Sequence, residues 1–105
     1  MKISAAGYSM GDNGVITRWI VEDDSGNDVG RVATEELDKN RIKVYNLFIS
    51  YGNRGRGYAD FTVKELIRLY AGKELVLVSE ADHLYEKNGF IHDGKFMVHK
   101  AGEKL

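Results

Sequence analysis

The stretch from Asn46 to Asp60, NLFISYGNRGRGYAD, decides the fold of this chain. An apolar strand runs into a loop that holds three glycines and two arginines, and the pattern predicts that a helix begins at Tyr58. Glycines let the backbone adopt φ > 0 and let a ligand approach closely, while the free N–H groups of a helix's first turn attract negative charge. Arg54 and Arg56 can each add a charge-assisted hydrogen bond of about 1.5–3 kcal/mol. The stretch therefore predicts a binding site for a phosphate or diphosphate.

Two common phosphate-binding motifs do not fit this loop. A Walker loop ends in Gly-Lys-Ser/Thr, and the chain has no such tripeptide. A dinucleotide-binding fingerprint needs a third glycine where this chain has Asp60. The loop also follows three predicted antiparallel strands rather than the first strand of a βαβ unit. The predicted anion site must therefore belong to another class.

A third motif fits the loop, and a second segment supports it. The segment RGRGYA, residues 54–59, follows the pattern Gln/Arg-x-x-Gly-x-Gly/Ala and resembles the acetyl-CoA diphosphate loop of GNAT-family N-acetyltransferases. Leu47-x-Ile49 stands where that family has a Leu-x-Val pair, and LYEKNGF at residues 84–90 is similar to its second signature. One predicted helix and one predicted strand separate the two motifs. The resemblance covers residues 42–100 well and residues 1–41 in outline, and it implies a small, minimal member of the family.

The resemblance implies acetyl-CoA as the cofactor and a set of residues that bind it. The loop from Gly52 to Ala59 would hold the diphosphate, and the strand before it would offer backbone N–H and C=O groups to the pantetheine arm. One of those N–H groups is the candidate oxyanion donor. The family often has Asn at the position of Val78, and we expect the adjacent Ser79 to substitute for it. The expected cofactor-binding residues are Leu47, Phe48, Ile49, Arg54, Gly55, Arg56, Gly57, Tyr58, Ala59 and Ser79.

The resemblance also implies the transfer of acetyl to a primary amine, of a small molecule or of a protein lysine or N-terminus. Tyr85 falls on the position whose phenol protonates the departing thiolate, and a phenol with a pKa near 10 can serve as that donor. The general base stays open among Glu80, His83, Glu36 and a water molecule. Three scattered histidines without suitable carboxylate spacing predict no metal site.

The chain reads as a mixed α/β sheet in one domain, residues 1–105. An antiparallel meander is followed by one parallel βαβ crossover and a terminal hairpin. The family usually has two helices between its first two strands, but residues 9–14 are too few to hold them. The expected strands are residues 2–8, 15–22, 29–34, 42–50 and 75–79, the helices residues 58–71 and 81–88, and the hairpin residues 90–99. Within the second helix, Glu86 and Asn88 are expected to be surface and capping residues.

Composition excludes several classes of protein. The chain has 105 residues, 43% of them apolar and 30% charged, which is ordinary for a globular domain. It has no cysteine, so disulfides and thiolate chemistry are excluded. The longest apolar run, Leu75 to Val78, is too short for a membrane span. The first residues show no basic region before an apolar stretch, so we expect no signal peptide and a cytoplasmic location.

The net charge of −1 argues against a duplex-DNA binder. Residues 22–38 contain seven acidic residues and one basic residue, Arg31. This acidic window predicts a solvated hairpin. The alternative is a negative electrostatic field that attracts a cationic amine. These acidic residues are Glu22, Asp23, Asp24, Asp28, Glu35, Glu36 and Asp38.

Two further functions compete with acetyl transfer. Without the two helices, a protein partner or a second copy of the chain could complete the acceptor site. The chain could then be a non-catalytic acetyl-CoA-binding regulator. A single-stranded nucleic-acid binder using Arg54, Arg56, Tyr51 and Tyr58 is the less favoured alternative.

Overall fold

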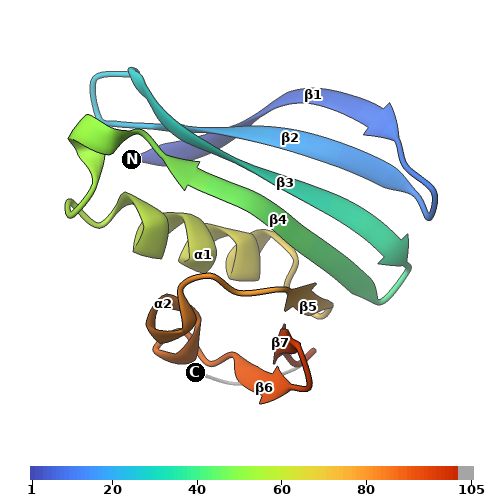
Figure 1. Cartoon of the computed structure of the whole chain (residues 1–105). Helices are drawn as coiled ribbons and strands as arrows, with labels where there is room; N and C mark the ends of the chain where they lie inside the picture. Colours follow the sequence, from blue (N-terminus) through green and yellow to red (C-terminus); the bar gives the residue numbers. More distant parts are fainter. Residues whose placement is uncertain (102–105) are drawn as a thin grey trace.

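The computed structural model describes residues 1–101, which form one mixed sheet with two helices (Figure 1). The last four residues of the predicted domain, 102–105, lie outside the described part of the chain. The strand order is β1-β2-β3-β4-β5-β7-β6, in which only β4 and β5 pair in parallel. The strands are β1 (Lys2–Met10), β2 (Val15–Glu22), β3 (Asp28–Asp38), β4 (Arg41–Ile49), β5 (Glu74–Leu77), β6 (Ile91–Asp93) and β7 (Phe96–His99). The helices are α1 (Tyr58–Leu69) and α2 (Asp82–Glu86), and a short 3-10 turn covers Tyr51–Asn53.

The predicted fold class is confirmed, including the absence of helices between the first two strands. β1 and β2 form a direct antiparallel hairpin. Their connection is a tight turn in which the N–H of Gly11 donates to the carbonyl of Gly14 at 2.8 Å. The helix from Tyr58 also begins where the sequence predicted it. Most strand boundaries were predicted to within one or two residues, and only β3 extends further, to Asp38.

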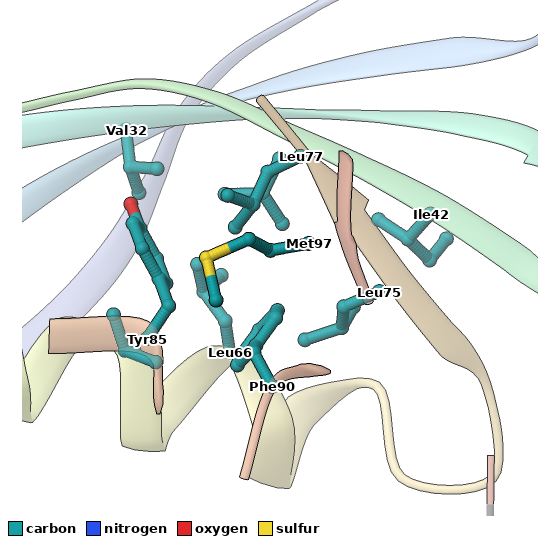
Figure 2. Close-up of a cluster of buried hydrophobic side chains, with 10 residues drawn as sticks. Val32, Ile42, Leu66, Leu75, Leu77, Tyr85, Phe90 and Met97 are labelled. Atoms are coloured by element: carbon teal, nitrogen blue, oxygen red, sulfur yellow. The ribbon is translucent and has the colours of Figure 1, made fainter. Parts of the chain in front are cut away.

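The core lies between the sheet and α1. Val63 and Leu66 on α1 are almost fully buried and pack against Ile42 and Val44 of β4. Figure 2 shows Leu66 beside Met97 and Phe90, near β5, which carries Leu75 and Leu77. The polar Thr62 is also fully buried on α1, and its hydroxyl donates to the carbonyl of Tyr58 at 2.8 Å. This bond satisfies the hydroxyl inside the apolar interface.

A β-bulge in β4 sets the geometry of the site. Asn46 has φ of 60°, and the register against β3 shifts between the pairs Ala33–Tyr45 and Arg31–Phe48. A bulge bends its strand and increases the local twist. β4 pairs with β5 only from Arg41 to Lys43, so the two strands separate beyond that point. β5 ends at Leu77, two residues earlier than predicted, and this last residue pairs only with Met97 of β7 because the pairing with β4 stops at Val76.

Candidate functional site

The separation of β4 from β5 opens a groove of about 680 Å³. This volume falls within the range of about 300–1,000 Å³ that is usual for small-molecule sites. One side of the groove is the second half of β4, and the other side is the chain that follows β5 together with α2. The lining residues are Lys43, Val44, Tyr45, Asn46, Leu47, Phe48, Ile49, Arg54, Ala59, Leu77, Val78, Glu80, Ala81, Leu84 and Tyr85.

The glycine loop joins β4 to α1 at one end of this groove. Gly55 and Gly57 have φ of 79° and 86°, and beyond the chain neighbours no heavy atom lies within 4 Å of a Cβ built on either. The first helical hydrogen bond runs from the N–H of Phe61 to the carbonyl of Gly57, and Gly57 caps the helix without a side chain. The N–H groups of residues 55–60 donate to no acceptor within residues 1–101. An anion can therefore reach a row of free donors at the positive end of the helix.

The two loop arginines have different environments. The Nε of Arg54 donates to the carbonyl of Ile49 at 2.9 Å, and its guanidinium lies 5.5 Å from the ring centroid of Phe48 and 5.6 Å from that of Tyr51. Arg54 is therefore held at the end of the groove. Arg56 is exposed and makes no hydrogen bond or ion pair with any described residue. It is free to meet a ligand at the outer side of the loop.

The strand residues expected beside a pantetheine arm all line the groove. Leu47, Phe48 and Ile49 lie beyond the last β4–β5 pair, so this edge of β4 has no strand partner among residues 1–101. The carbonyl of Ile49 is already used by Arg54, and Phe48 pairs with Arg31 of β3, which leaves the backbone of Leu47 as the open edge. Ala59 lines the groove, whereas Tyr58 begins α1 without touching it.

Tyr85 forms part of the groove wall and is only 7% exposed. Its ring packs edge-on against Phe90 with the centroids 5.3 Å apart, and Figure 2 shows its hydroxyl oxygen directed toward Val32. The hydroxyl makes no hydrogen bond within the described chain. Burial raises the pKa of Tyr85 above its ordinary value of 10.0, so the phenol keeps its proton at neutral pH.

The segment after β5 brings one of the candidate bases to the groove. Glu80 lines it, but His83 and Glu36 do not. Ser79 is also absent from the lining, and its Oγ accepts a hydrogen bond from the N–H of Ala81 at 3.0 Å in the turn before α2. Its expected role as a cofactor ligand stays a prediction.

Sequence reasoning missed a polar cluster that joins α1 to α2. Asn88 is 6% exposed, and its Nδ2 donates to Asp60 Oδ1 at 2.9 Å and to the carbonyl of Leu84 at 2.8 Å. Asp60 also pairs with Lys64 at 2.6 Å and with Lys87 at 3.5 Å. The hydrogen bonds from Lys64 and Asn88 lower the pKa of Asp60 to about 2. The cluster fixes the helix that carries Tyr85 to the first turn beside the glycine loop. In the sequence, the only local indication of this cluster was the position of Asn88 directly before Gly89.

The seven residues of the acidic window do not form one continuous region of negative charge. Asp28 begins β3 and Asp38 ends it, so the two groups of acidic residues lie at opposite ends of an 11-residue strand, about 30 Å apart. Residues 1–101 contain no group of three side chains suited to holding a metal ion. No helix in this part of the chain is long and apolar enough to cross a membrane.

Comparisons with known proteins agree with this geometry. A family model described as "Acetyltransferase (GNAT) domain" matches residues 16–92. Spermidine N-acetyltransferase from Vibrio cholerae, solved with CoA and spermine, is 21% identical with a TM-score of 0.69, and the match covers 79% of this chain and 64% of that one. A GNAT-family N-acetyltransferase from Escherichia coli, solved with CoA, is 23% identical with a TM-score of 0.64, and the match covers 79% of this chain and 57% of that one.

The structural matches bear on the fold alone at this level of identity. The chain spans less than two thirds of the length of both enzymes, and no curated protein sequence matches it. The family model, in contrast, covers well over half of the chain and includes the glycine loop, the separated strands and α2. The chain therefore belongs to the GNAT acetyltransferase family.

Proposed function

We propose that this protein transfers an acetyl group from acetyl-CoA to a primary amine by direct transfer in a ternary complex. The observation that carries the proposal is the groove between β4 and β5. It has free N–H donors at one end and the hydroxyl-bearing Tyr85 in its wall. Membership in the family and the CoA bound to the Vibrio cholerae enzyme support acetyl-CoA as the donor.

The residues present fit acetyl-CoA. The N–H groups around Gly55 and Gly57 would bind the diphosphate, with Arg54 and Arg56 supplying positive charge. The open backbone edge at Leu47 would orient the pantetheine arm. Alignment of the two bound reactants would make the largest contribution to the rate, because effective molarities of about 10⁵–10⁸ M are reached in well-oriented systems.

Acetyl-CoA supplies the acetyl thioester, and the chain supplies orientation and a proton. A backbone N–H at the bulge in β4 is the candidate donor to the developing oxyanion. Tyr85 would protonate the departing thiolate, since its raised pKa keeps the phenol protonated across the physiological range. Glu80 is the candidate general base because it is the carboxylate on the groove wall.

Calorimetry with acetyl-CoA on a pair of matched glycine variants tests this assignment. Gly57→Glu places a strained side chain and a negative charge at the proposed diphosphate site, and we expect it to abolish binding. Gly72→Glu is the control, because Gly72 has the same φ of 86° and the same open surroundings in the turn after α1. Unchanged affinity in Gly57→Glu, or equal loss in both variants, would refute the site.

One observation favours a second function. β1 is joined directly to β2, so the helices that form one side of the acceptor site in most family members are absent. The chain could therefore bind acetyl-CoA without catalysis and dock on another protein, or use a second copy to complete the site. Affinity capture with and without acetyl-CoA, followed by an acetylation assay of what is captured, separates these cases. Turnover by the isolated chain would dismiss the non-catalytic function.

A further inference from the structure

The groove is closed on one face of the sheet and open on the other. Ala59, Leu84 and Tyr85 close it from the helices. No helix of the described residues covers the opposite face of the sheet (Figure 1). Side chains alternate along a strand, and Val44 is buried under α1, so Lys43 and Tyr45 point to the open face. An acceptor must therefore approach across the open face.

Two cations lie on aromatic rings at the β4 rim of this open side. Lys43 Nζ is 5.6 Å from the ring centroid of Tyr45, and the Arg31 guanidinium is 6.0 Å from that of Phe48. Both rings line the groove. Neither cation forms an ion pair with any of residues 1–101. The ring contacts hold the two positive charges at the rim without neutralising them.

The carboxylates near this face are placed differently. Glu35 is the register partner of Lys43, but its Oε2 lies 3.4 Å from the N–H nitrogen of Asn13, in the turn between β1 and β2. It does not line the groove. Glu80 does line the groove, on the wall opposite β4. Burial and, to a smaller extent, the charge of Glu35 raise the pKa of Tyr45, so Glu35 lies near this rim and partly offsets Lys43. The open mouth thus has two cations and one carboxylate near its β4 rim, and the carboxylate of Glu80 on the opposite wall.

We infer that the acceptor is a small amine that also carries an anionic group, either a carboxylate or a phosphate. Lys43 and Arg31 bind the anion, while Glu80 receives the ammonium group. A polyamine, which has only positive charges, meets repulsion at the β4 rim. This inference rests on the proposed acetyl transfer and adds the class of acceptor to it.

Thiol release at saturating acetyl-CoA, measured on matched amines, tests the inference. The pairs are β-alanine against propylamine and phosphoethanolamine against ethanolamine, with spermidine as the polyamine. We expect kcat/KM to be about tenfold higher for the anionic member of at least one pair, which is the effect of one or two partly exposed ion pairs. The preferred pair distinguishes a carboxylate from a phosphate.

Charge-removing variants locate the effect. Lys43→Gln and Arg31→Gln should each raise KM for the anionic amine several-fold and leave KM for acetyl-CoA unchanged. Lys43→Arg should keep the preference, and Lys73→Gln, in the turn after α1, should change nothing. Circular dichroism checks that each variant is folded.

Several outcomes overturn the inference without touching the proposed function. These are preference for the neutral amine or spermidine, or a rise in KM for acetyl-CoA in the variants. No turnover of any amine despite acetyl-CoA binding would count against the proposed acetyl transfer and the inference together. Failure of acetyl-CoA to bind the unmodified protein would instead remove the proposed function itself.

Discussion

Replacing Asp60 with Asn should remove a stabilisation that depends on pH. Asp60 lies in the first turn of α1 and accepts hydrogen bonds from Lys64 and Asn88 while Lys87 lies 3.5 Å away. An asparagine at this position can still accept the bond from Asn88, but it loses the attraction to both lysines. The variant therefore isolates the charge of this cluster from its shape.

The pKa of Asp60 gives the size of the effect. A carboxyl whose pKa is 3.8 when unfolded and about 2 when folded contributes about 2 kcal/mol at neutral pH. The side chain is 29% exposed, and solvent screening together with the retained hydrogen bond reduces this figure. We expect Asp60→Asn to lower the free energy of unfolding by about 1–2 kcal/mol at pH 7. The corresponding fall in Tm is roughly 5–10 °C.

Urea denaturation from pH 7 to pH 2 is the assay. Because the folded pKa lies below the unfolded one, the stabilisation is complete above about pH 4 and is lost as the pH falls toward 2. The free energies of unfolding of Asp60→Asn and the unmodified protein should therefore differ at pH 7 and become similar near pH 2. Asp12→Asn, in the exposed turn between β1 and β2, serves as the control for removal of one negative charge. If the difference in unfolding free energy between Asp60→Asn and the unmodified protein stays constant down to pH 2, the electrostatic explanation is refuted.

Two further substitutions separate chemistry from stability. Tyr85→Phe should lower kcat by roughly 10²–10⁴-fold, since it removes the proposed acid. Its unfolding free energy should change by less than about 0.5 kcal/mol, because the hydroxyl makes no hydrogen bond within the described chain. Thr34→Val should lower stability without affecting the site. Thr34 Oγ1 lies 3.0 Å from Trp19 Nε1 and 2.9 Å from the Tyr70 hydroxyl. Loss of these buried partners should cost about 1–3 kcal/mol in urea denaturation while calorimetry shows unchanged acetyl-CoA affinity.

The sequence by itself determined the local elements and the loop between them. Glycines at positions 55 and 57 predicted positive φ, and the helix starts at Tyr58 because apolar residues follow at helical spacing. The short connection between β1 and β2 excluded helices there. The two family motifs implied the class of fold, and the family match bears this out. These features depend on residues close together in the chain, so local patterns were sufficient.

Only the tertiary structure decided the shape of the groove and its charges. The bulge at Asn46 arises from the register of β4 against β3, and it is this bulge that ends the pairing with β5 after Lys43. The surface position expected for Asn88 was wrong, because its partner Asp60 stands 28 positions earlier in the chain. The placement of Arg31 beside Phe48 likewise follows from strand pairing. Such contacts depend on how distant segments meet, and no local pattern of residues encodes that.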